Sequence, residues 1–196
     1  MDLFKGVDRL PVLVGAIAVA LHGADANARQ SCVQPAAPTV DVGFSPEGSA
    51  ERLVLDAICS SHRSIHVSAY AFTSAPIAAA LAEARRRGVA VAVVADRRIN
   101  LVEDRSGQAI RTLNRLARSG VQVRIIDVYP VHHDKSMVID GDSVETGSFN
   151  FTTRAARYNS ENAVVIWHVP SIASAYDEHW QSRFNQGRPW QVGASN

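Results

Sequence analysis

Cysteine is scarce in this chain, which has only Cys32 and Cys59 among 196 residues. They form no Cys-x-x-Cys pair, and two thiolates cannot build an all-cysteine zinc site, which takes four. An oxidising compartment would permit a disulfide between them. Cys59, however, falls on the apolar side of a predicted helix, where cysteine is commonly a small buried hydrophobic residue. The sequence leaves both alternatives open.

An excess of charge of one sign is also lacking. The chain carries 20 Lys and Arg against 19 Asp and Glu, a formal net charge of +1, so its overall charge does not indicate a nucleic-acid-binding protein. An apolar fraction of 46% argues against a disordered chain. No internal repeat, linker or low-complexity tract divides the sequence, and we expect a single domain.

No apolar run is long enough to cross a bilayer, which takes about 20 residues. The longest, Leu10–Leu21, follows the basic residue Lys5 and precedes the small-residue segment Ala24–Ala28. These are the three parts of a secretory signal. We therefore expect residues 1–28 to be a removed signal peptide, with cleavage after Ala28 or two residues earlier, rather than a buried helix. The protein is then exported, periplasmic or secreted, with no stable membrane anchor.

Strands and helices alternate along the rest of the chain. After a short lead-in at residues 29–44, we expect a catalytic domain at 45–190, in which Ser45 caps the first helix and Pro46 begins it. Alternation or β-branched runs predict strands at 65–70, 89–95, 121–126 and 162–167, and helical spacing predicts helices to about His62, at 74–87, up to Gly120 and at 170–185. This order predicts an α/β fold with a mixed central β-sheet flanked by helices on both faces.

The most informative stretch runs from His133 to Asn150. It reads H-x-K-x4-D-x6-G-S-x-N without a mismatch, through His133, Lys135, Asp140, Gly147, Ser148 and Asn150. Chance rarely fills so many specified positions within one short block. The pattern occurs once, and no second H-x-K is present.

The spacing of this block predicts a β-hairpin. Asp140–Gly141 is a turn signal between two β-prone runs. With a two-residue loop His133 lies opposite Ser148, and with the longest loop considered it lies opposite Asn150. Strand side chains alternate between faces, so His133 shares a face with Lys135, and Ser148 shares one with Asn150. Asp140 completes the motif and counts among its catalytic residues, but it falls in the turn, where we expect a structural role.

These residue types suit attack on a phosphodiester without a metal or other cofactor. The transition state spreads negative charge over the non-bridging oxygens, which the Lys135 ammonium and the polar groups of Ser148 and Asn150 can stabilise. A neutral imidazole can attack phosphorus to give a covalent intermediate. The leaving oxygen then needs a proton, which a second imidazole can give.

The block resembles the HKD motif of the phospholipase D superfamily, and its surroundings are similar to the small Nuc-type bacterial endonucleases. The similarity covers roughly residues 41–186 and includes the segments Tyr70–Ser74, Arg87–Asp96, Gly147–Thr152 and Asn159–Ile166. It implies a phospholipase D-like fold in which His133 is the nucleophile. Lys135, Ser148 and Asn150 would bind the phosphate, and Glu161 would hydrogen-bond and orient the histidine.

The resemblance also implies a homodimer. Small members carry one motif per chain and pair two chains, so that both histidines face one phosphate and no metal is required. His132 would point to the opposite face of the strand from His133. His66 could approach the site, but we expect it to be a sheet histidine with satisfied hydrogen bonds. The second catalytic histidine must then come from another copy of the chain.

Three classes of function compete: a nuclease, an enzyme acting on phospholipid head groups, and a binding protein without catalysis. The last is disfavoured because every motif residue is present. No lid or exposed aromatic stripe indicates a lipase, since Trp180 and Phe184 repeat at helical spacing typical of a core. We expect a sequence-nonspecific nuclease acting on DNA, or also on RNA. The backbone contacts are expected from two arginine groups, which are Arg97, Arg98 and Arg105, and Arg154 and Arg157.

Overall fold

The computed structural model describes residues 34–193. The signal peptide predicted at residues 1–28 and Cys32 lie outside this range. Cys59 ends the first helix and is disulfide-bonded. The alternative of a buried free thiol at Cys59 is therefore wrong.

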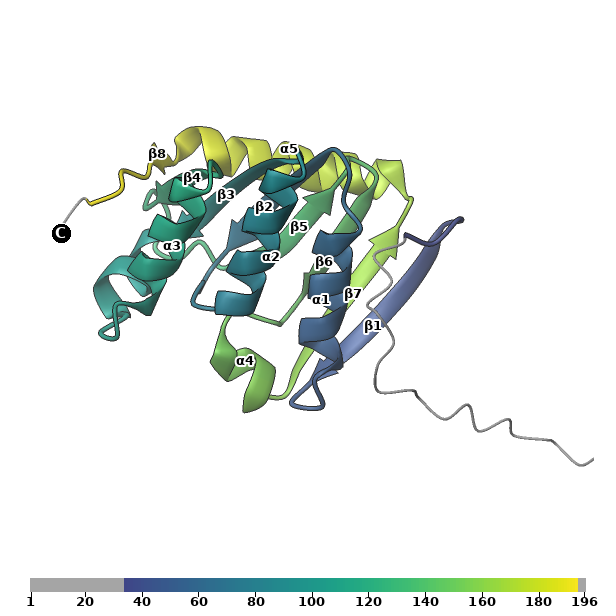
Figure 1. The fold of residues 1–196 in the computed structure, drawn as a ribbon, viewed down its shortest axis with the longest axis horizontal. Helices are drawn as coiled ribbons and strands as arrows, with labels where there is room; N and C mark the ends of the chain where they lie inside the picture. The colour runs from purple at the N-terminus through teal and green to yellow at the C-terminus, as the bar shows by residue number, and fades with distance from the viewer. Residues whose placement is uncertain (1–33, 194–196) are drawn as a thin grey trace, which may run out of the picture.

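One mixed sheet forms the centre of the molecule (Figure 1), with the strand order β1-β7-β6-β5-β2-β3-β4-β8. The strands β2, β3 and β4 are mutually parallel, and every other neighbouring pair is antiparallel. Their bounds are β1 Thr39–Ser45, β2 Ser64–Ala69, β3 Ala90–Asp96, β4 Gln122–Ile126, β5 Lys135–Ile139, β6 Ser143–Gly147, β7 Glu161–Trp167 and β8 Arg188–Pro189. The parallel early strands and the antiparallel hairpin confirm the predicted topology.

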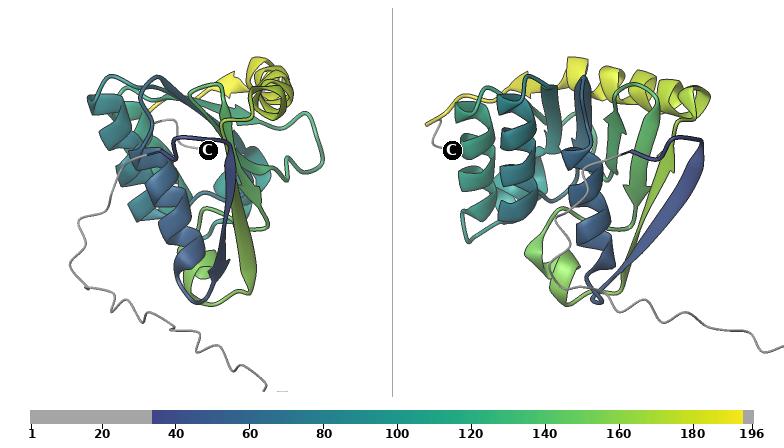
Figure 2. Two further views of the ribbon diagram at one scale, coloured as in Figure 1. Left: turned by 90° about the vertical axis from the view of Figure 1, so that its right-hand side faces the viewer. Right: turned by 45° about the vertical axis from the view of Figure 1, so that its right-hand side comes forward.

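Helices cover both faces of the sheet, as the sequence predicts (Figure 2). One face carries α1 (Ser49–Cys59), α2 (Ala75–Arg86) and α3 (Gln108–Arg118), which pack on the largest apolar cluster. The other face carries α5 (Pro170–Gln186), whose apolar side packs on the sheet in two smaller clusters. The remaining helical segments are the π-helix η1 (Arg98–Glu103) and the short α4 (Thr153–Arg157).

The start of the domain differs from the prediction. Residues 39–45, expected as a lead-in and a helix cap, form the edge strand β1, which pairs along its whole length with β7. The helix α1 begins at Ser49, after Gly48 as N-cap. A Cβ at Gly43 would lie 2.6 Å from the Ser49 carbonyl oxygen, so this glycine lets α1 pack closely on β1. Val40, Val42 and Phe44 alternate with smaller or polar residues, which is a strand pattern. The Pro- and Ala-rich composition of the surrounding residues obscured this pattern.

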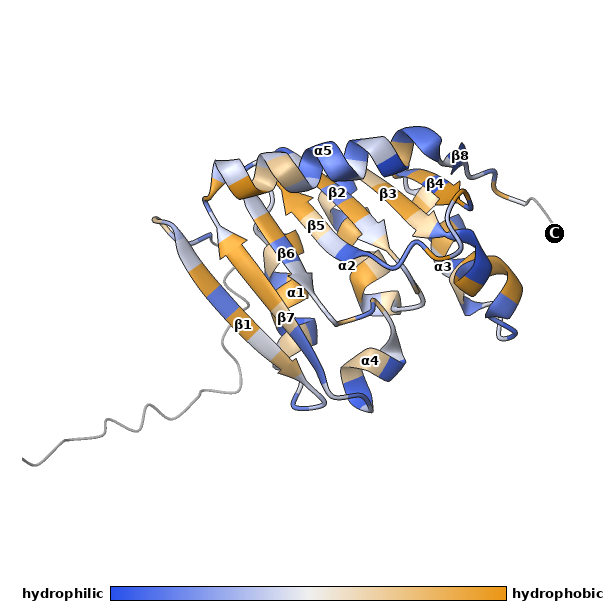
Figure 3. Ribbon diagram, turned by 180° about the vertical axis from the view of Figure 1, so that it is seen from behind, coloured by the Kyte–Doolittle hydropathy of each residue, from blue (hydrophilic) through white to orange (hydrophobic). Residues whose placement is uncertain are grey.

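The face that carries α5 is only partly covered (Figure 3). The helix crosses one end of the strands and leaves β1 uncovered. Val40, Val42 and Phe44 point to this side and are more than half exposed, at 57%, 58% and 53%. This apolar strip of β1 has no covering element among residues 34–193.

Candidate active site

The motif occupies the β5–β6 hairpin. Its register pairs Ser136 with Thr146 and Val138 with Val144, which places the whole of Asp140–Asp142 in the loop. The loop is thus one residue longer than a two-residue Asp-Gly turn, and His133 and Ser148 are not cross-strand partners. His133 lies just before β5 and Ser148 just after β6. The two ends of the hairpin still bring the motif residues together.

Gly147 explains how the motif approaches the next strand. A Cβ at this position would lie 2.3 Å from the carbonyl oxygen of Asn162 on β7. The backbone amides of Ser148 and Phe149 both donate to that same carbonyl, each at 3.1 Å. The glycine therefore lets the chain after β6 pack tightly enough on β7 to place Ser148 beside Glu161.

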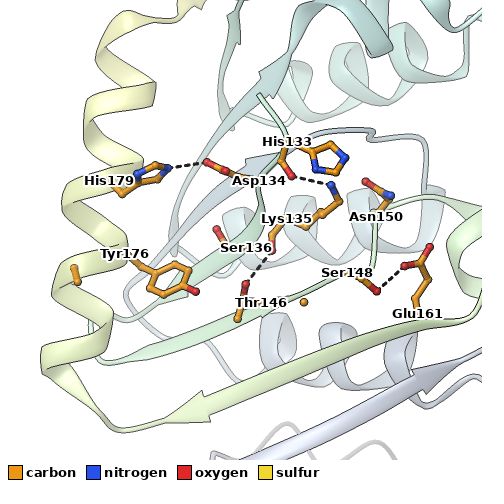
Figure 4. A pocket seen from close by; sticks show the side chains of 12 residues that line it. His133, Asp134, Lys135, Ser136, Thr146, Ser148, Asn150, Glu161, Tyr176 and His179 are labelled. Atoms are coloured by element: carbon orange, nitrogen blue, oxygen red, sulfur yellow. Dashed lines mark hydrogen bonds and ion pairs between the residues drawn. The ribbon is translucent and has the colours of Figure 1, made fainter. Parts of the chain in front are cut away.

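A cavity of about 740 Å³ opens where these segments meet (Figure 4). Five of the predicted site residues line it, which are His133, Lys135, Ser148, Asn150 and Glu161. The remaining lining residues are Asp134, Ser136, Thr146 and Gly147 from the hairpin, and Ala175, Tyr176 and His179 from α5. Asp140 is not among them.

His133 presents a free imidazole to this cavity. The residue is exposed, and its ring contacts the ring of Tyr70, with 4.6 Å between the centroids and a 59° tilt. Within residues 34–193 its ring nitrogens make no hydrogen bond, so either nitrogen is available to a ligand. An imidazole in this position can act as a nucleophile or as a general acid or base.

Lys135 is a buried cation, with only 8% of its surface exposed. Its Nζ donates to the carbonyl oxygen of His133 at 2.7 Å and lies 4.8 Å from the centroid of the Tyr70 ring. It forms no ion pair in the described part of the chain. Burial lowers the pKa of Lys135, while the carboxylates of Asp134 and Glu161 act in the opposite direction. A phosphate in the cavity would supply the anion that this ammonium lacks.

Ser148, Asn150 and Glu161 form the other side of the cavity. The Ser148 hydroxyl donates to Glu161 Oε2 at 2.6 Å, and Asn159 Nδ2 donates to Glu161 Oε1 at 2.8 Å. A hydrogen bond donated by the His133 ring to Glu161, which the family resemblance implies, is not formed within the described chain. The Oδ1 atom of Asn150 is buried and has no hydrogen-bond partner among the described residues.

Asp140 holds the turn of the hairpin against β2. Its carboxylate accepts hydrogen bonds from three successive backbone amides, those of His62, Arg63 and Ser64, at 2.6–3.1 Å. Burial alone would raise its pKa, but these amides and the Gln34 side chain lower the pKa of Asp140. Although the motif groups Asp140 with the catalytic residues, its position outside the cavity supports the structural role expected from the turn.

The other candidate histidines serve the fold. His132 is buried, and its backbone amide donates to Asp96 Oδ2 at 2.8 Å; burial lowers the pKa of its side chain. His66 stacks on Trp180 with 4.0 Å between ring centroids and has Asp177 Oδ1 2.5 Å from its Nδ1. As expected, neither lines the cavity.

The wall that α5 adds to the cavity was not anticipated. Tyr176 and His179 lie three residues apart on the last helix and share its cavity-facing side. Their spacing and the position of the helix on the sheet were the only available signal, because no motif contains them. The structure thus enlarges the site beyond the residues of the sequence motif.

Residues 34–193 lack two features, a candidate metal cluster and a membrane-spanning helix. They contain no group of three or more His, Cys, Asp or Glu side chains that could hold a metal ion. None of their helices combines the length and the apolar character needed to cross a membrane.

Comparisons with known proteins agree with this geometry. The family described as "Cardiolipin synthase, PLD-like domain" matches residues 54–184. A protein of Rickettsia bellii named "Phospholipase D" is 36% identical over 144 residues, which cover 74% of this chain and 68% of that protein.

Solved structures give the same assignment. Nuc of Salmonella typhimurium, a phospholipase D family member, is 48% identical, has a TM-score of 0.76, and is matched over 79% of this chain and 99% of its own. NucT from Helicobacter pylori shares the fold at 19% identity, with a TM-score of 0.69 over 79% of this chain and 100% of its own. The chain belongs to the phospholipase D superfamily, is of the Nuc type, and is a phosphodiesterase of that superfamily.

Proposed function

We propose that this protein is a metal-independent, sequence-nonspecific endonuclease that hydrolyses phosphodiester bonds of DNA, with RNA as a second substrate. The observation that carries the proposal is the free imidazole of His133, which faces the same cavity as Lys135, Ser148 and Asn150. A phosphate placed among these groups would meet one nucleophile, one buried cation and two polar side chains.

The chemistry runs in two displacements. A ring nitrogen of His133 attacks phosphorus, a P–N bond forms, and the P–O bond to the leaving group breaks. A second imidazole gives its proton to the departing oxygen. Water then attacks phosphorus with the same imidazole as base, the P–N bond breaks, and a phosphomonoester leaves. Lys135 and the polar groups of Ser148 and Asn150 stabilise the charge on the non-bridging oxygens in both steps.

The second imidazole comes from His133 of another copy of the chain, because the sequence contains one motif only. The apolar strip of β1 supports such a homodimer. Val42 pairs with Val164 across β1 and β7, and Val164 pairs with Thr146 across β7 and β6. Directly paired residues share a face of the sheet, so the strip continues into Thr146, which lines the cavity. A second copy seated there would close over the site.

Nucleic acid is the substrate class that we favour. The similarity to Nuc, at 48% identity, supports it, as do Arg154 and Arg157, which are exposed on α4 soon after Asn150 and form no ion pair with another described residue. Arg98, by contrast, has Glu103 Oε1 2.5 Å from its Nε, so its charge is already balanced. Backbone phosphates would therefore be contacted first by the arginines of α4.

Phospholipid head groups are the alternative substrate. Two observations favour it: the Rickettsia relative is named "Phospholipase D", and the strip of β1 is apolar and exposed. A lipid enzyme could lay such a strip on a membrane surface instead of on a second copy.

We infer export from the signal peptide predicted at residues 1–28. The disulfide at Cys59 supports this inference, because disulfides persist in oxidising compartments such as the bacterial periplasm or the extracellular medium.

The test incubates purified protein with plasmid DNA and with phosphatidylcholine vesicles, both in excess EDTA. We expect nicking and linearisation of the plasmid, no release of choline, and no activity from the His133→Ala variant. Release of choline while the DNA stays intact would contradict the nuclease proposal and support phospholipid as the substrate. Loss of DNA cleavage in EDTA, with recovery on adding a divalent cation, would refute the metal-independent mechanism.

A further inference from the structure

The cavity extends well beyond the groups that hold a phosphate. Its motif side is formed by His133, Lys135, Ser148, Asn150 and Glu161, whereas the opposite wall is formed by α5. Figure 4 shows Tyr176 and His179 reaching from this helix toward the hairpin, with Ser136 and Thr146 between the two sides. A lone phosphate would not fill a space of about 740 Å³, so the cavity has room beside the α5 wall for one of the groups esterified to that phosphate.

Tyr176 is held by the core on one side and lines the cavity on the other. It packs against the cluster of Val138, Val144 and Ala173, which fixes the position of its ring. Its hydroxyl has no hydrogen-bond partner among residues 34–193. An aromatic ring held in this way is a platform for a flat ligand group, because little conformational freedom remains to be lost on binding.

His179 is joined to the motif through Asp134. Its Nε2 lies 2.8 Å from Asp134 Oδ2, and Asp134 stands between His133 and Lys135 in the chain. The other ring nitrogen of His179 makes no hydrogen bond within the described chain. With the hydroxyls of Ser136 and Thr146, this imidazole gives the wall polar groups beside the aromatic ring of Tyr176.

We propose that the α5 wall is a nucleoside subsite, in which Tyr176 contacts the base or sugar next to the scissile phosphate and His179 donates or accepts a hydrogen bond there. The proposal rests on the nuclease function and specifies the part of the substrate that this cavity takes. An aromatic platform with polar neighbours matches the flat face and polar edge of a nucleoside. The Thr146 hydroxyl already donates to the Lys135 carbonyl oxygen at 3.4 Å, but acyl chains would leave the Ser136 hydroxyl without a partner.

The test compares chromogenic diesters that differ only in the retained group. Methyl 4-nitrophenyl phosphate needs the motif alone, whereas the 5′ and 3′ 4-nitrophenyl phosphate esters of thymidine also place a nucleoside in the cavity. A fourth probe, 4-nitrophenyl phosphorylcholine, places a lipid head group there. The variants are Tyr176→Leu, which keeps apolar packing without the ring, and His179→Ala, with Glu178→Ala on the same helix as control.

We expect Tyr176→Leu to lower kcat/KM for one thymidine ester by about 10-fold, in line with the loss of one stacking contact. The methyl ester, which reports on folding and on the motif, should be cleaved at the wild-type rate. His179→Ala should act in the same direction, and Glu178→Ala should leave all four probes unchanged.

Three results would overturn the subsite. An equal loss on the methyl and thymidine esters would make Tyr176 a residue of the fold or of the phosphate site. Wild-type values for both thymidine esters in both variants would show that the wall touches no nucleoside. A selective loss on the phosphorylcholine ester would make the wall a head-group site. A wild-type enzyme that cleaves the methyl ester but not DNA would refute the nuclease function itself, separately from these results.

Discussion

Glu145 is an acidic residue that is buried inside the sheet, where an ionised side chain is unfavourable. It lies on β6 between Met137 of β5 and Val165 of β7, is 0% exposed, and neither carboxylate oxygen has a hydrogen-bond partner among the described residues. Burial raises the pKa of Glu145 to about 8. The native protein therefore holds this carboxyl in its neutral form at neutral pH, on the strand β6 that leads directly to Ser148.

This carboxyl should make the fold less stable as the pH rises. The native state keeps the proton up to about pH 8, whereas the unfolded state loses it above about pH 4.5, so its contribution is fully present below 4.5 and is lost between these two values. Urea unfolding of wild type and Glu145→Gln across this window should show the variant gaining, relative to wild type, about 1 kcal/mol per pH unit. A constant difference from pH 5 to 8 would contradict the buried neutral acid.

Lys135 should lower the stability of the fold while it raises the rate of catalysis. A buried ammonium without a carboxylate partner is costly to the fold. Lys135→Met should therefore raise the free energy of unfolding by about 1 kcal/mol while it lowers the turnover of the methyl ester by about 100-fold or more. Unfolding in urea and the chromogenic assay measure the two effects on one preparation. A variant that is both less stable and fully active would show that Lys135 serves the fold.

At the scale of elements, the β5–β6 hairpin is the part that positions the site. Gly147 lets it approach β7, and Asp140 ties its turn to the start of β2 through three backbone amides. Asp140 also has a φ of 54°, in the left-handed region that Asp and Asn tolerate better than most residues. The catalytic end of the hairpin thus depends on contacts made at its other end.

Asp140→Ala should therefore weaken the fold and spare the chemistry. Loss of the carboxylate leaves three partly buried amides without this acceptor, at a cost of about 2 kcal/mol, while kcat per folded molecule stays at the wild-type value. Asp142→Ala is the matched control in the same turn, because the Asp142 carboxylate contacts the side chains of Ser143, His168 and Arg63 rather than backbone amides. Thermal unfolding and active-site titration separate the two effects. A fall in kcat for the folded Asp140 variant would restore this residue to the catalytic set.

Local patterns explain which elements could be predicted. The hairpin, the parallel early strands and α5 follow from turn signals and periodicity that lie within short segments. The edge strand β1 was missed because Pro, Gly and Ala surround a short alternation. The loop length was left open between two and more residues because a single residue decides it. The cavity wall of Tyr176 and His179 was missed because it depends on how α5 crosses the sheet, which only tertiary packing determines.

At the scale of the whole molecule, the site looks incomplete within one chain. No side chain among residues 34–193 hydrogen-bonds the His133 ring, and the two Glu161 oxygens accept hydrogen bonds from Ser148 and Asn159. The apolar strip of β1 lies along the edge of the sheet, and α5 does not cover it (Figure 3). Pairing of two copies would account for both features.

Val42→Glu should therefore disrupt pairing. A carboxylate at the centre of the strip would be buried in the dimer without a cationic partner. The free energy of removing this charge from water would exceed the favourable free energy of the apolar contacts around it. We expect a monomer by light scattering, with activity reduced at least about 10-fold at low protein concentration. Val102→Glu is the matched control, because both side chains are 58% exposed and Val102 lies in η1, away from the strip. A dimeric and active Val42 variant would place the interface elsewhere.

Hybrid dimers test whether one active site takes a His133 imidazole from each of two chains. Wild-type and His133→Ala chains carrying different affinity tags are mixed, exchanged and purified through both tags, and DNA cleavage in EDTA is compared with the wild-type homodimer. If one active site needs an imidazole from each chain, the hybrid should be nearly inactive. A hybrid with half the wild-type activity, or full activity in a verified wild-type monomer, would show that each chain carries a complete site and would contradict the account.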